Sequence, residues 1–320
     1  MALNEFALIR QYFTGLGEGR GVALGVGDDC ALLDVPDDRQ LAVTVDTLVA
    51  GVHFPDGAAP GDIARRALRV NLSDLAAMGA EPRWFTLALT LPAAEEAWLE
   101  AFAAALAEDA QQFQCALVGG DTTAGPLALS IQMMGLAPRG QALTRAGARA
   151  GDDVYVTGSL GEGAAALQLF VPECPFPEAV TRQLHARFYT PMPRLREGVL
   201  LRQLASAAID ISDGLLADLG HIGESSGLGA EIDLSQLPLA PWLSAVTSAE
   251  QLQHWAINGG DDYELCFTAP TESRAQLQAL IASGELAATR IGCMTPEPGV
   301  RCLDAKRRPV TVDSAGYQHF

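Results

Sequence analysis

The chain has 320 residues, 49% of them hydrophobic and 19% charged, and a formal net charge of −18 at pH 7. This length predicts two domains with sizeable cores, and the acidic balance argues against a general nucleic-acid binder, whose surface is usually basic. No stretch approaches the roughly 18 uninterrupted apolar residues of a membrane helix, and the N-terminus lacks the pattern of a signal peptide. We therefore expect a cytoplasmic protein without a membrane or nucleic-acid partner.

The first half of the chain alternates between strand and helix patterns. Residues 41–48 follow a period of two, which predicts a strand with Thr44 and Asp46 on one face. A helix is predicted at 60–78, with a proline near its start and a glycine just after its end. Further strands are predicted at 84–91, 115–118 and 127–136, and a helix at 93–112.

A stretch at 137–151 is rich in Gly, Arg and Ala and lacks strand periodicity, which indicates a connection between domains. We expect an N-terminal domain at 1–138, a linker at 139–150 and a C-terminal domain at 151–320. The mixture of elements in both halves predicts α+β or α/β domains. In the second half, strands are predicted at 152–157, 206–212 and 262–268, and helices at 162–170, 214–224 and 274–283.

Short acidic clusters flanked by glycines recur along the chain. Asp46 and Asp210 stand inside apolar strands, and Asp121 follows a strand that reads as buried, where an unpaired carboxylate is costly. Any single cluster could be a simple turn, and Asp213 could cap the helix after it. Taken together, the clusters indicate a cation site, because carboxylate and hydroxyl oxygens suit Mg²⁺ ions that bridge to substrate phosphates.

Several other chemistries lack their motifs. The only lysine is Lys306, and no GxxxxGK[ST] sequence occurs, so phosphates would be handled by metal ions, arginines and backbone amides. The histidines show no zinc-site spacing, and the six cysteines form no CxxC pair, which is typical of reduced buried thiols. The glycines at 158, 161 and 163 follow a strand like a nucleotide-binding turn, but their order is GxxGxG and they serve equally well as plain turn residues.

These motifs, in order over nearly the whole chain, resemble the thiamine-monophosphate kinase family, which belongs to the superfamily of aminoimidazole ribonucleotide synthetase. As a set they are highly specific, although each alone is weak. The matching segments are GVGDDCALL (25–33), TVDTLVAGVHF (44–54), NLSDLAAMGA (71–80), GGDTT (119–123), LTRAGARAGD (143–152), YVTG (155–158), AIDISDGL (208–215), GGDDYELCF (259–267) and the C-terminal residues Gly316, Tyr317, His319 and Phe320, with Glu5, Phe6, Leu8 and Ile9 at the start.

The resemblance implies a reaction and an architecture. ATP would donate its γ-phosphoryl group to thiamine monophosphate, giving thiamine diphosphate and ADP, with several Mg²⁺ ions as cofactors. The N-terminal α+β domain would form a homodimer in which strands of two subunits build a β-barrel. ATP would lie in the groove between this domain and the C-terminal α/β domain.

The resemblance also implies roles for individual residues. Val45 replaces a residue that can carry a hydroxyl in relatives, so its metal contact would come from the backbone. Asp261 stands where relatives carry glutamate, so its reach is one methylene shorter. Asp46, Asp74, Asp121 and Asp210 would be the central catalytic carboxylates. The metal positions are Asp29, Thr44, Val45, Asp46, Asp74, Asp121, Asp210 and Asp213; the ATP positions are Gly120, Asp121, Arg145 and Ser212; and the substrate positions are His53, Asp261 and Tyr317.

Two alternatives remain open at this point. Another ATP-using member of the superfamily, similar to aminoimidazole ribonucleotide synthetase, would share the nucleotide site but take a different acceptor. A non-catalytic Mg-nucleotide-binding module would bind ATP without turnover. Selenophosphate synthetase and the hydrogenase-maturation relative fit less well, because the first would need a reactive residue near the N-terminus and the second a C-terminal cysteine. The first cysteine here is Cys30, and the chain ends in Phe320.

Overall fold

The computed structural model describes residues 5–172, 174, 176–312 and 316. The chain divides into two compact units, Met1–Leu75 with Ala80–Gly140 and Ala76–Gly79 with Gln141–Phe320. The division after Gly140 falls inside the stretch expected to be a linker, and the assignment of 76–79 to the second unit has no counterpart in the sequence pattern. Among the described residues, no helix combines the length and the apolar character needed to cross a membrane.

The first unit is built on a four-stranded mixed sheet with the order β3-β6-β4-β5. Strand β6 pairs antiparallel with β3 and β4, and β5 pairs parallel with β4. A small β1–β2 hairpin lies beside it. The elements are α1 (Glu5–Tyr12), η1 (Thr14–Leu16), β1 (Val22–Leu24), β2 (Leu32–Leu33), β3 (Arg39–Val49), α2 (Pro60–Ala77), β4 (Glu81–Leu91), α3 (Glu96–Gln112), β5 (Ala116–Ala124) and β6 (Ala128–Pro138).

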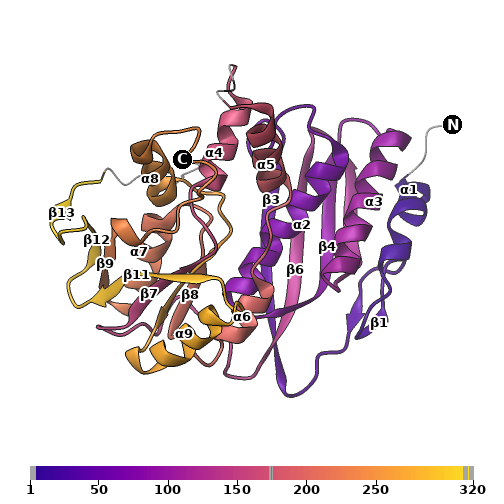
Figure 1. Ribbon diagram of the computed structural model, residues 1–320. Coiled ribbons are helices and arrows are strands. Elements are labelled where there is room, and N and C mark those ends of the chain that lie inside the picture. Colours follow the sequence, from indigo (N-terminus) through magenta and orange to yellow (C-terminus); the bar gives the residue numbers. More distant parts are fainter. Residues whose placement is uncertain (1–4, 173, 175, 313–315, 317–320) are drawn as a thin grey trace. The chain divides into compact units, whose positions relative to one another are not determined.

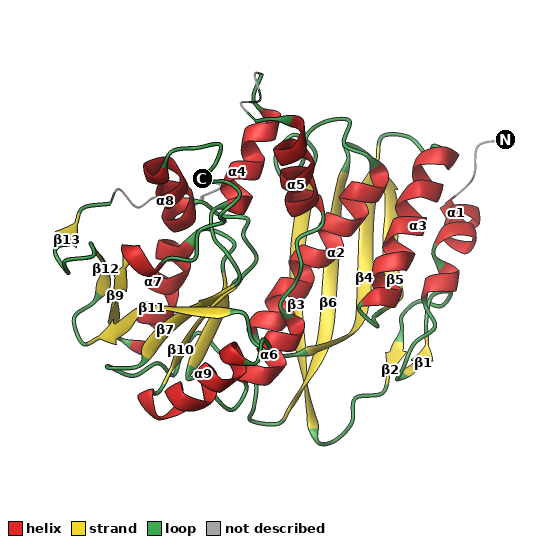
Figure 2. Cartoon of the chain, viewed as in Figure 1, coloured by secondary structure: helices red, strands yellow, loops and turns green. Residues whose placement is uncertain are grey.

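Helices α2 and α3 lie across one face of this sheet (Figure 2). Helix α2 buries a stripe at helical spacing, formed by Ile63, Ala67, Leu68, Leu72 and Leu75, each at most 1% exposed. The same periodicity made this helix predictable from the sequence. Because α2 covers this face, polar side chains that β3 turns toward it come to lie beneath a helix.

The opposite face of the sheet is only partly covered. Trp84 and Met134 pack there with Val22 and Leu33 of the hairpin. On the outer strand β3, by contrast, Leu41, Val43 and Val45 are 43%, 51% and 61% exposed, although the alternation of the strand places all three on one face. Side chains this apolar form an exposed stripe of a kind that marks interaction surfaces.

The second unit contains a seven-stranded sheet with the order β13-β12-β9-β11-β7-β10-β8. Among the strands that the structure describes in this unit, only the β9–β12 pair is parallel, so the expected α/β domain has a mainly antiparallel sheet. The elements are β7 (Asp153–Thr157), α4 (Glu162–Leu167), η2 (Gln168–Phe170), α5 (Glu178–Tyr189), α6 (Leu195–Leu201), β8 (Ala207–Asp210), α7 (Leu215–Ser226), β9 (Gly229–Asp233), η3 (Leu234–Gln236), α8 (Ala249–Asn258), β10 (Leu265–Ala269), η4 (Thr271–Ser273), α9 (Arg274–Ala282), β11 (Ala288–Thr295), β12 (Gly299–Leu303) and β13 (Pro309–Val310).

Helices cover both faces of this second sheet (Figure 1). Val154 and Val156 of β7 pack with α7 and α8 on one face, while Tyr155 between them packs with α6 and α9 on the other. Strands β7 and β10 and the outer strand β8 are buried at every residue. This explains why they read as continuous apolar runs in the sequence, and why an acidic residue at the end of one of them needs a partner.

Candidate active site

Three of the expected metal residues meet where β3 passes beneath α2. Thr44 Oγ1 donates a short hydrogen bond to Asp74 Oδ2 of the helix. One turn earlier on the same helix, the fully buried Asn71 accepts the backbone N–H of Asp46 at 3.1 Å and donates to the carbonyl of Ala67 at 2.9 Å. The NLSD motif thus fixes the middle of β3 at two points, and it brings Thr44, Asp46 and Asp74 together.

This pair of carboxylates carries an electrostatic cost. Burial, and then the charge of Asp74, raise the pKa of the Asp46 carboxyl to about 6. Two acidic groups and a hydroxyl are hard oxygen donors, and Mg²⁺ usually binds through one or two carboxylates while keeping waters and substrate phosphates in its other positions. Thr44, Asp46 and Asp74 therefore fit a magnesium ion. No group of three His, Cys, Asp or Glu side chains among the described residues forms a metal cage by itself.

Asp121 lies elsewhere in the same unit. It belongs to β5, at the opposite edge of the sheet from β3, and its register partner on β4 is Ala88. Three strand spacings separate the two edges, which is about 14 Å. Within one chain, Asp121 therefore cannot share an ion directly with Asp46. Gly120, beside it, passes so close to Leu87 that a Cβ would come within 2.0 Å of the Leu87 carbonyl oxygen, which requires glycine there.

Of the other expected residues of the first unit, Asp29 and Val45 are exposed and His53 is half-buried. Asp29 lies on the loop between β1 and β2, where its N–H group bonds to the carboxylate of Asp28 at 2.8 Å. Val45 points to the exposed face of β3. His53 follows β3, and its Nδ1 accepts the N–H of Val49 at 3.0 Å, so the ring proton is on Nε2.

In the second unit, the DISDG segment (residues 210–214) carries three expected site residues. Strand β8 ends at Asp210, which is 4% exposed. The chain then turns, and Oδ2 of the buried Asp218 accepts the backbone N–H groups of Ser212, Asp213 and Gly214 at 3.1, 3.1 and 3.0 Å. Asp218 holds the segment, so the possible helix-capping role of Asp213 is wrong. Asp213 remains a metal candidate.

The pKa of Asp218 reflects this setting. Burial and the charge of Asp213 raise the pKa of the Asp218 carboxyl to about 6, while the N–H groups of Asp213 and Gly214 oppose the rise. A single carboxylate oxygen that accepts three consecutive amides resembles an anion bound in a backbone nest. Asp218 was not predicted from the sequence, where its only signal was an acidic residue in the apolar first turn of the helix.

The GGDDYE segment (residues 259–264) is joined to the DISDG segment by backbone hydrogen bonds. Asp261 donates to the carbonyl of Ser212 at 2.9 Å, and Tyr263 donates to Ile211 at 2.8 Å. An expected substrate residue and an expected ATP residue are therefore neighbours. Asp261 and Tyr263 have φ angles of 71° and 48°. A left-handed backbone at a non-glycine residue costs about 1–3 kcal/mol, so surrounding contacts must hold both.

This geometry corrects the predicted strand at 262–268. Alternate residues in left-handed conformation cannot continue a β-ladder, so β10 begins only at Leu265.

The same segment shows what the glycine-rich turn at 158–163 binds. The Asp262 carboxylate accepts the N–H groups of Gly161 and Gly163 at 2.8 and 2.9 Å, and thus occupies the amides that a phosphate would need. These glycines shape a turn around a protein carboxylate and do not form a dinucleotide site.

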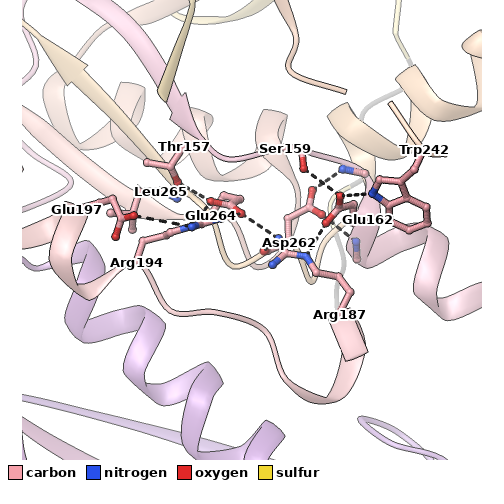
Figure 3. A network of polar contacts seen from close by, with 12 residues as sticks. Thr157, Ser159, Glu162, Arg187, Arg194, Glu197, Trp242, Asp262, Glu264 and Leu265 are labelled. Carbon is pink, nitrogen blue, oxygen red and sulfur yellow. Dashed lines mark hydrogen bonds and ion pairs between the residues drawn. The ribbon is translucent and has the colours of Figure 1, made fainter. Parts of the chain in front are cut away.

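Asp262 is itself fully buried. Burial raises the pKa of its carboxyl to about 7, against the charge of Arg187 and the two glycine N–H groups. Next to it, Glu264 is 1% exposed and accepts hydrogen bonds from Arg194, Arg187 and Thr157 (Figure 3). The sequence marks this acidic stretch as a unit, but its pattern does not reveal which of the acids face the protein interior.

Two expected residues remain. Arg145 is exposed in the second unit, directly after Thr144, whose carbonyl accepts the N–H of Ala208 in β8 at 2.9 Å. Tyr317 lies outside the described residues. Gly316 before it is described, and a Cβ there would meet Ala217 at 2.6 Å and the carbonyl oxygen of Asp213 at 3.4 Å. The end of the described chain therefore passes beside the DISDG segment.

Two family models match the chain. Residues 27–137 match the AIR synthase related protein N-terminal domain, and residues 149–304 match the AIR synthase related protein C-terminal domain. The chain is 48% identical over 322 residues to a thiamine-monophosphate kinase of Escherichia coli strain K12, covering 100% of this chain and 99% of the relative.

Solved structures give the same picture. The crystal structure of thiamine-monophosphate kinase from Stenotrophomonas maltophilia K279a is similar with a TM-score of 0.86 and 46% identity, over 94% of this chain and 97% of that one. The structure of AaThiL complexed with AMPPCP and TMP is similar with a TM-score of 0.79 and 31% identity, over 100% of this chain and 99% of that one. Each likeness extends over both units.

Proposed function

This chain belongs to the AIR synthase related family and, within it, to the thiamine-monophosphate kinases, and from that premise we propose that it phosphorylates thiamine monophosphate with ATP. The observation that carries the proposal is the full-length similarity to kinases of this name, at 48% identity to the relative from Escherichia coli. The complex of AaThiL with AMPPCP and TMP supports the same pair of ligands, a nucleotide and a thiamine phosphate.

The reaction places few demands on acid–base chemistry. A phosphate monoester has its second pKa near 6, so the acceptor oxygen is largely ionised at neutral pH and needs no general base. This oxygen forms a bond to the γ-phosphorus of ATP as the bond from that phosphorus to the bridging oxygen of ADP breaks, and ADP leaves. The task of the protein is to bring two polyanions together in line.

The residues divide this task between them. Asp46, Asp74 and the hydroxyl of Thr44 would hold magnesium in the first unit, and Asp210 and Asp213 would supply further carboxylates in the second. When bound, Mg²⁺ neutralises the phosphate oxygens that carry charge in the transition state. Asp29, the backbone of Val45, and Asp121 complete the proposed metal positions. Gly120, Arg145 and Ser212 are proposed for ATP, and His53, Asp261 and Tyr317 for the acceptor.

A homodimer is part of this proposal. The exposed Leu41, Val43 and Val45 stripe on β3 is the surface we assign to contact with a second copy, whose strands would close a barrel with these. The dimer also gives Asp121 a role. Strands β3 and β5 are the two outer strands of the sheet, so the β5 strand of a second copy can bring its Asp121 toward Asp46. That ATP contacts both units and that the enzyme works in the cytoplasm belong to the same proposal.

An acceptor panel tests the function. Release of ADP is measured with thiamine monophosphate and with formylglycinamidine ribonucleotide, each with and without Mg²⁺. We expect magnesium-dependent turnover with thiamine monophosphate alone. Turnover with the ribonucleotide alone would assign the chain to the synthetase reaction, and nucleotide binding without turnover would make it a binding module.

A further inference from the structure

A buried carboxylate at the end of the GGDDYE segment collects four hydrogen bonds. Arg194 binds Glu264 through two atoms, from Nε to Oε2 at 2.5 Å and from Nη2 to Oε1 at 2.6 Å. Thr157 Oγ1 adds a bond to Oε2 at 2.7 Å, and Arg187 Nη2 adds one to Oε1 at 3.1 Å. Figure 3 shows both arginines turned toward this one carboxylate. We call Thr157, Arg187, Arg194 and Glu264 the Glu264 network.

Arg187 links this network to the backbone of the segment. Besides Glu264, its Nη2 donates a short hydrogen bond to the main-chain carbonyl of Asp262, and its Nε lies 3.1 Å from Oε2 of Glu162. Glu162 is fixed in turn by Trp242 Nε1 at 3.1 Å (Figure 3). One guanidinium thus ties a side chain, a backbone carbonyl and helix α4 together.

The residues that these contacts enclose are the strained ones. Asp261 and Tyr263, both left-handed, flank Asp262, whose carbonyl is held by Arg187 and whose carboxylate is held by the Gly161 and Gly163 amides. Left-handed residues persist where surrounding structure over-determines them, and they concentrate at ligand sites. The fixed contacts surround the position expected to recognise the acceptor.

We infer that Arg194 and Arg187 are positioning residues for the phosphate acceptor: by clamping Glu264 and the Asp262 carbonyl, they hold Asp261 in the backbone conformation that binds thiamine monophosphate. This inference rests on the proposed function, because the substrate role of Asp261 comes from it. Neither arginine needs to touch the substrate. The DISDG segment with Ser212, on the ATP side, shares backbone hydrogen bonds with the GGDDYE segment but has an anchor of its own in Asp218, which neither arginine contacts.

The test is the variant Arg194→Lys. Lysine keeps the positive charge but cannot form the two-point contact of a guanidinium. A matched control exists in the same unit: Arg274 binds the 1% exposed Asp153 in the same two-point way, at 2.7 and 2.9 Å, away from the GGDDYE segment in sequence. Arg274→Lys therefore breaks an equivalent ion pair without loosening this segment.

Two readouts are taken on the full-length enzyme. Steady-state kinetics give KM separately for thiamine monophosphate and for ATP, and hydrogen exchange follows the amides of residues 259–264. For Arg194→Lys we expect KM for thiamine monophosphate to rise about tenfold, KM for ATP to change less than twofold, and exchange of the segment to accelerate. Arg274→Lys should leave both KM values and this exchange unchanged.

Other outcomes have definite meanings. Equal rises in both KM values, or a normal KM for thiamine monophosphate in a folded Arg194→Lys enzyme, overturn the inference. If Arg194→Lys does not fold, Arg187→Lys is measured in its place and judged by the same KM comparison. A wild-type enzyme that does not turn over thiamine monophosphate refutes the proposed function, whereas unchanged exchange at 259–264 in the variant refutes the positioning role independently.

Discussion

Burial and the charge of Asp74 together bring the pKa of the neighbouring Asp46 carboxyl to about 6, so these two groups destabilise the fold when no cation lies between them. We predict that Asp46→Asn, measured by thermal unfolding without divalent ions, is more stable than the wild type by roughly 1–3 kcal/mol. The same substitution removes the stabilisation by Mg²⁺, which for the wild type reaches about 2.7 kcal/mol at a concentration 100 times the dissociation constant.

The exposed Glu108 on α3 provides the control for this experiment. Glu108→Gln removes an acidic group of the same unit and should leave the response to Mg²⁺ intact. An Asp46→Asn protein that gains as much stability from Mg²⁺ as the wild type would remove Asp46 from the metal site.

Asp218 is predicted to matter for turnover because it holds the backbone of the DISDG segment. Asp218→Ala leaves the N–H groups of residues 212–214 without their acceptor, which should cost about 1–3 kcal/mol of unfolding free energy and lower turnover at least tenfold. Asp218→Asn keeps one acceptor oxygen, so it should lose less unfolding free energy and less turnover than Asp218→Ala. Asp233→Ala, which removes the half-buried N-cap of η3 in the same unit, is the control. Equal turnover in Asp218→Ala and the control would argue against the role.

Asp262 predicts a pH dependence of stability. Its pKa is raised by burial from 3.8 to about 7, so the folded state keeps a proton that the unfolded chain releases near pH 4. The contribution of Asp262 to the free energy of unfolding is therefore fully present below about pH 4. It is lost as the pH rises toward 7, by at most about 1.4 kcal/mol per pH unit.

The measurement compares urea unfolding of the wild type and Asp262→Asn between pH 5 and pH 8. The amide can accept only one of the two bonds from Gly161 and Gly163, so the variant is less stable at pH 5. Because the asparagine does not titrate, the difference in free energy of unfolding between the two proteins should narrow as the pH rises. If the two free energies of unfolding instead change in parallel between pH 5 and pH 8, Asp262 is ionised throughout this range.

The exposed stripe of Leu41, Val43 and Val45 on β3 predicts a dimer that a charged substitution in the stripe should dissociate. Val45 is 61% exposed, so Val45→Glu should leave the fold of the monomer intact while it shifts the molecular mass measured by light scattering from dimer toward monomer. Met192→Glu changes a residue that is 45% exposed in the second unit and should leave the mass unchanged. A wild-type protein that is monomeric at all concentrations would refute the assignment.

The same dimer makes a prediction about activity. If Asp121 of one copy serves the Asp46 site of the other, then Asp46→Asn and Asp121→Asn subunits, each inactive alone, should regain up to about a quarter to a half of wild-type activity when they are mixed and reassembled. If the mixtures stay inactive, Asp46 and Asp121 act in the site of one chain. That result would contradict the separation of about 14 Å between the two outer strands that carry them.

Much of the fold was predictable because helices and strands here carry clear periodicities. The predicted helix at 60–78 is α2 at Pro60–Ala77, and the strand at 41–48 lies within β3 at Arg39–Val49. Several elements were not predicted, and they are short or lack strong patterns: α1, β1, β2, α5, α6, α8, β9, β11, β12 and β13. The predicted strand at 115–118 continues as β5 to Ala124, because Gly119 and Gly120 pair in the sheet where turns were expected.

The residue types of the candidate site come from the sequence and stay a prediction, whereas its geometry could be obtained only from the fold. Thr44 and Asp46 share a strand face, which the period of two indicates, but their meeting with Asp74 depends on how α2 packs. Similarly, the sequence marks Asp261, Asp262 and Glu264 as one acidic segment. Which of these carboxylates faces the protein interior depends on the left-handed residues at 261 and 263, and single-sequence patterns do not encode such a backbone.

The most direct test follows the phosphoryl group itself. ATP labelled at its γ-phosphorus is incubated with the enzyme, thiamine monophosphate and Mg²⁺, and the label is traced in the products. We expect one terminal phosphate of thiamine diphosphate to be labelled for each ADP formed, with no labelled enzyme, and the rate to fall at least a hundredfold for folded Asp46→Asn or when Mg²⁺ is removed. Label recovered only in inorganic phosphate, or transfer at the full rate without Mg²⁺, would contradict direct magnesium-dependent transfer to thiamine monophosphate.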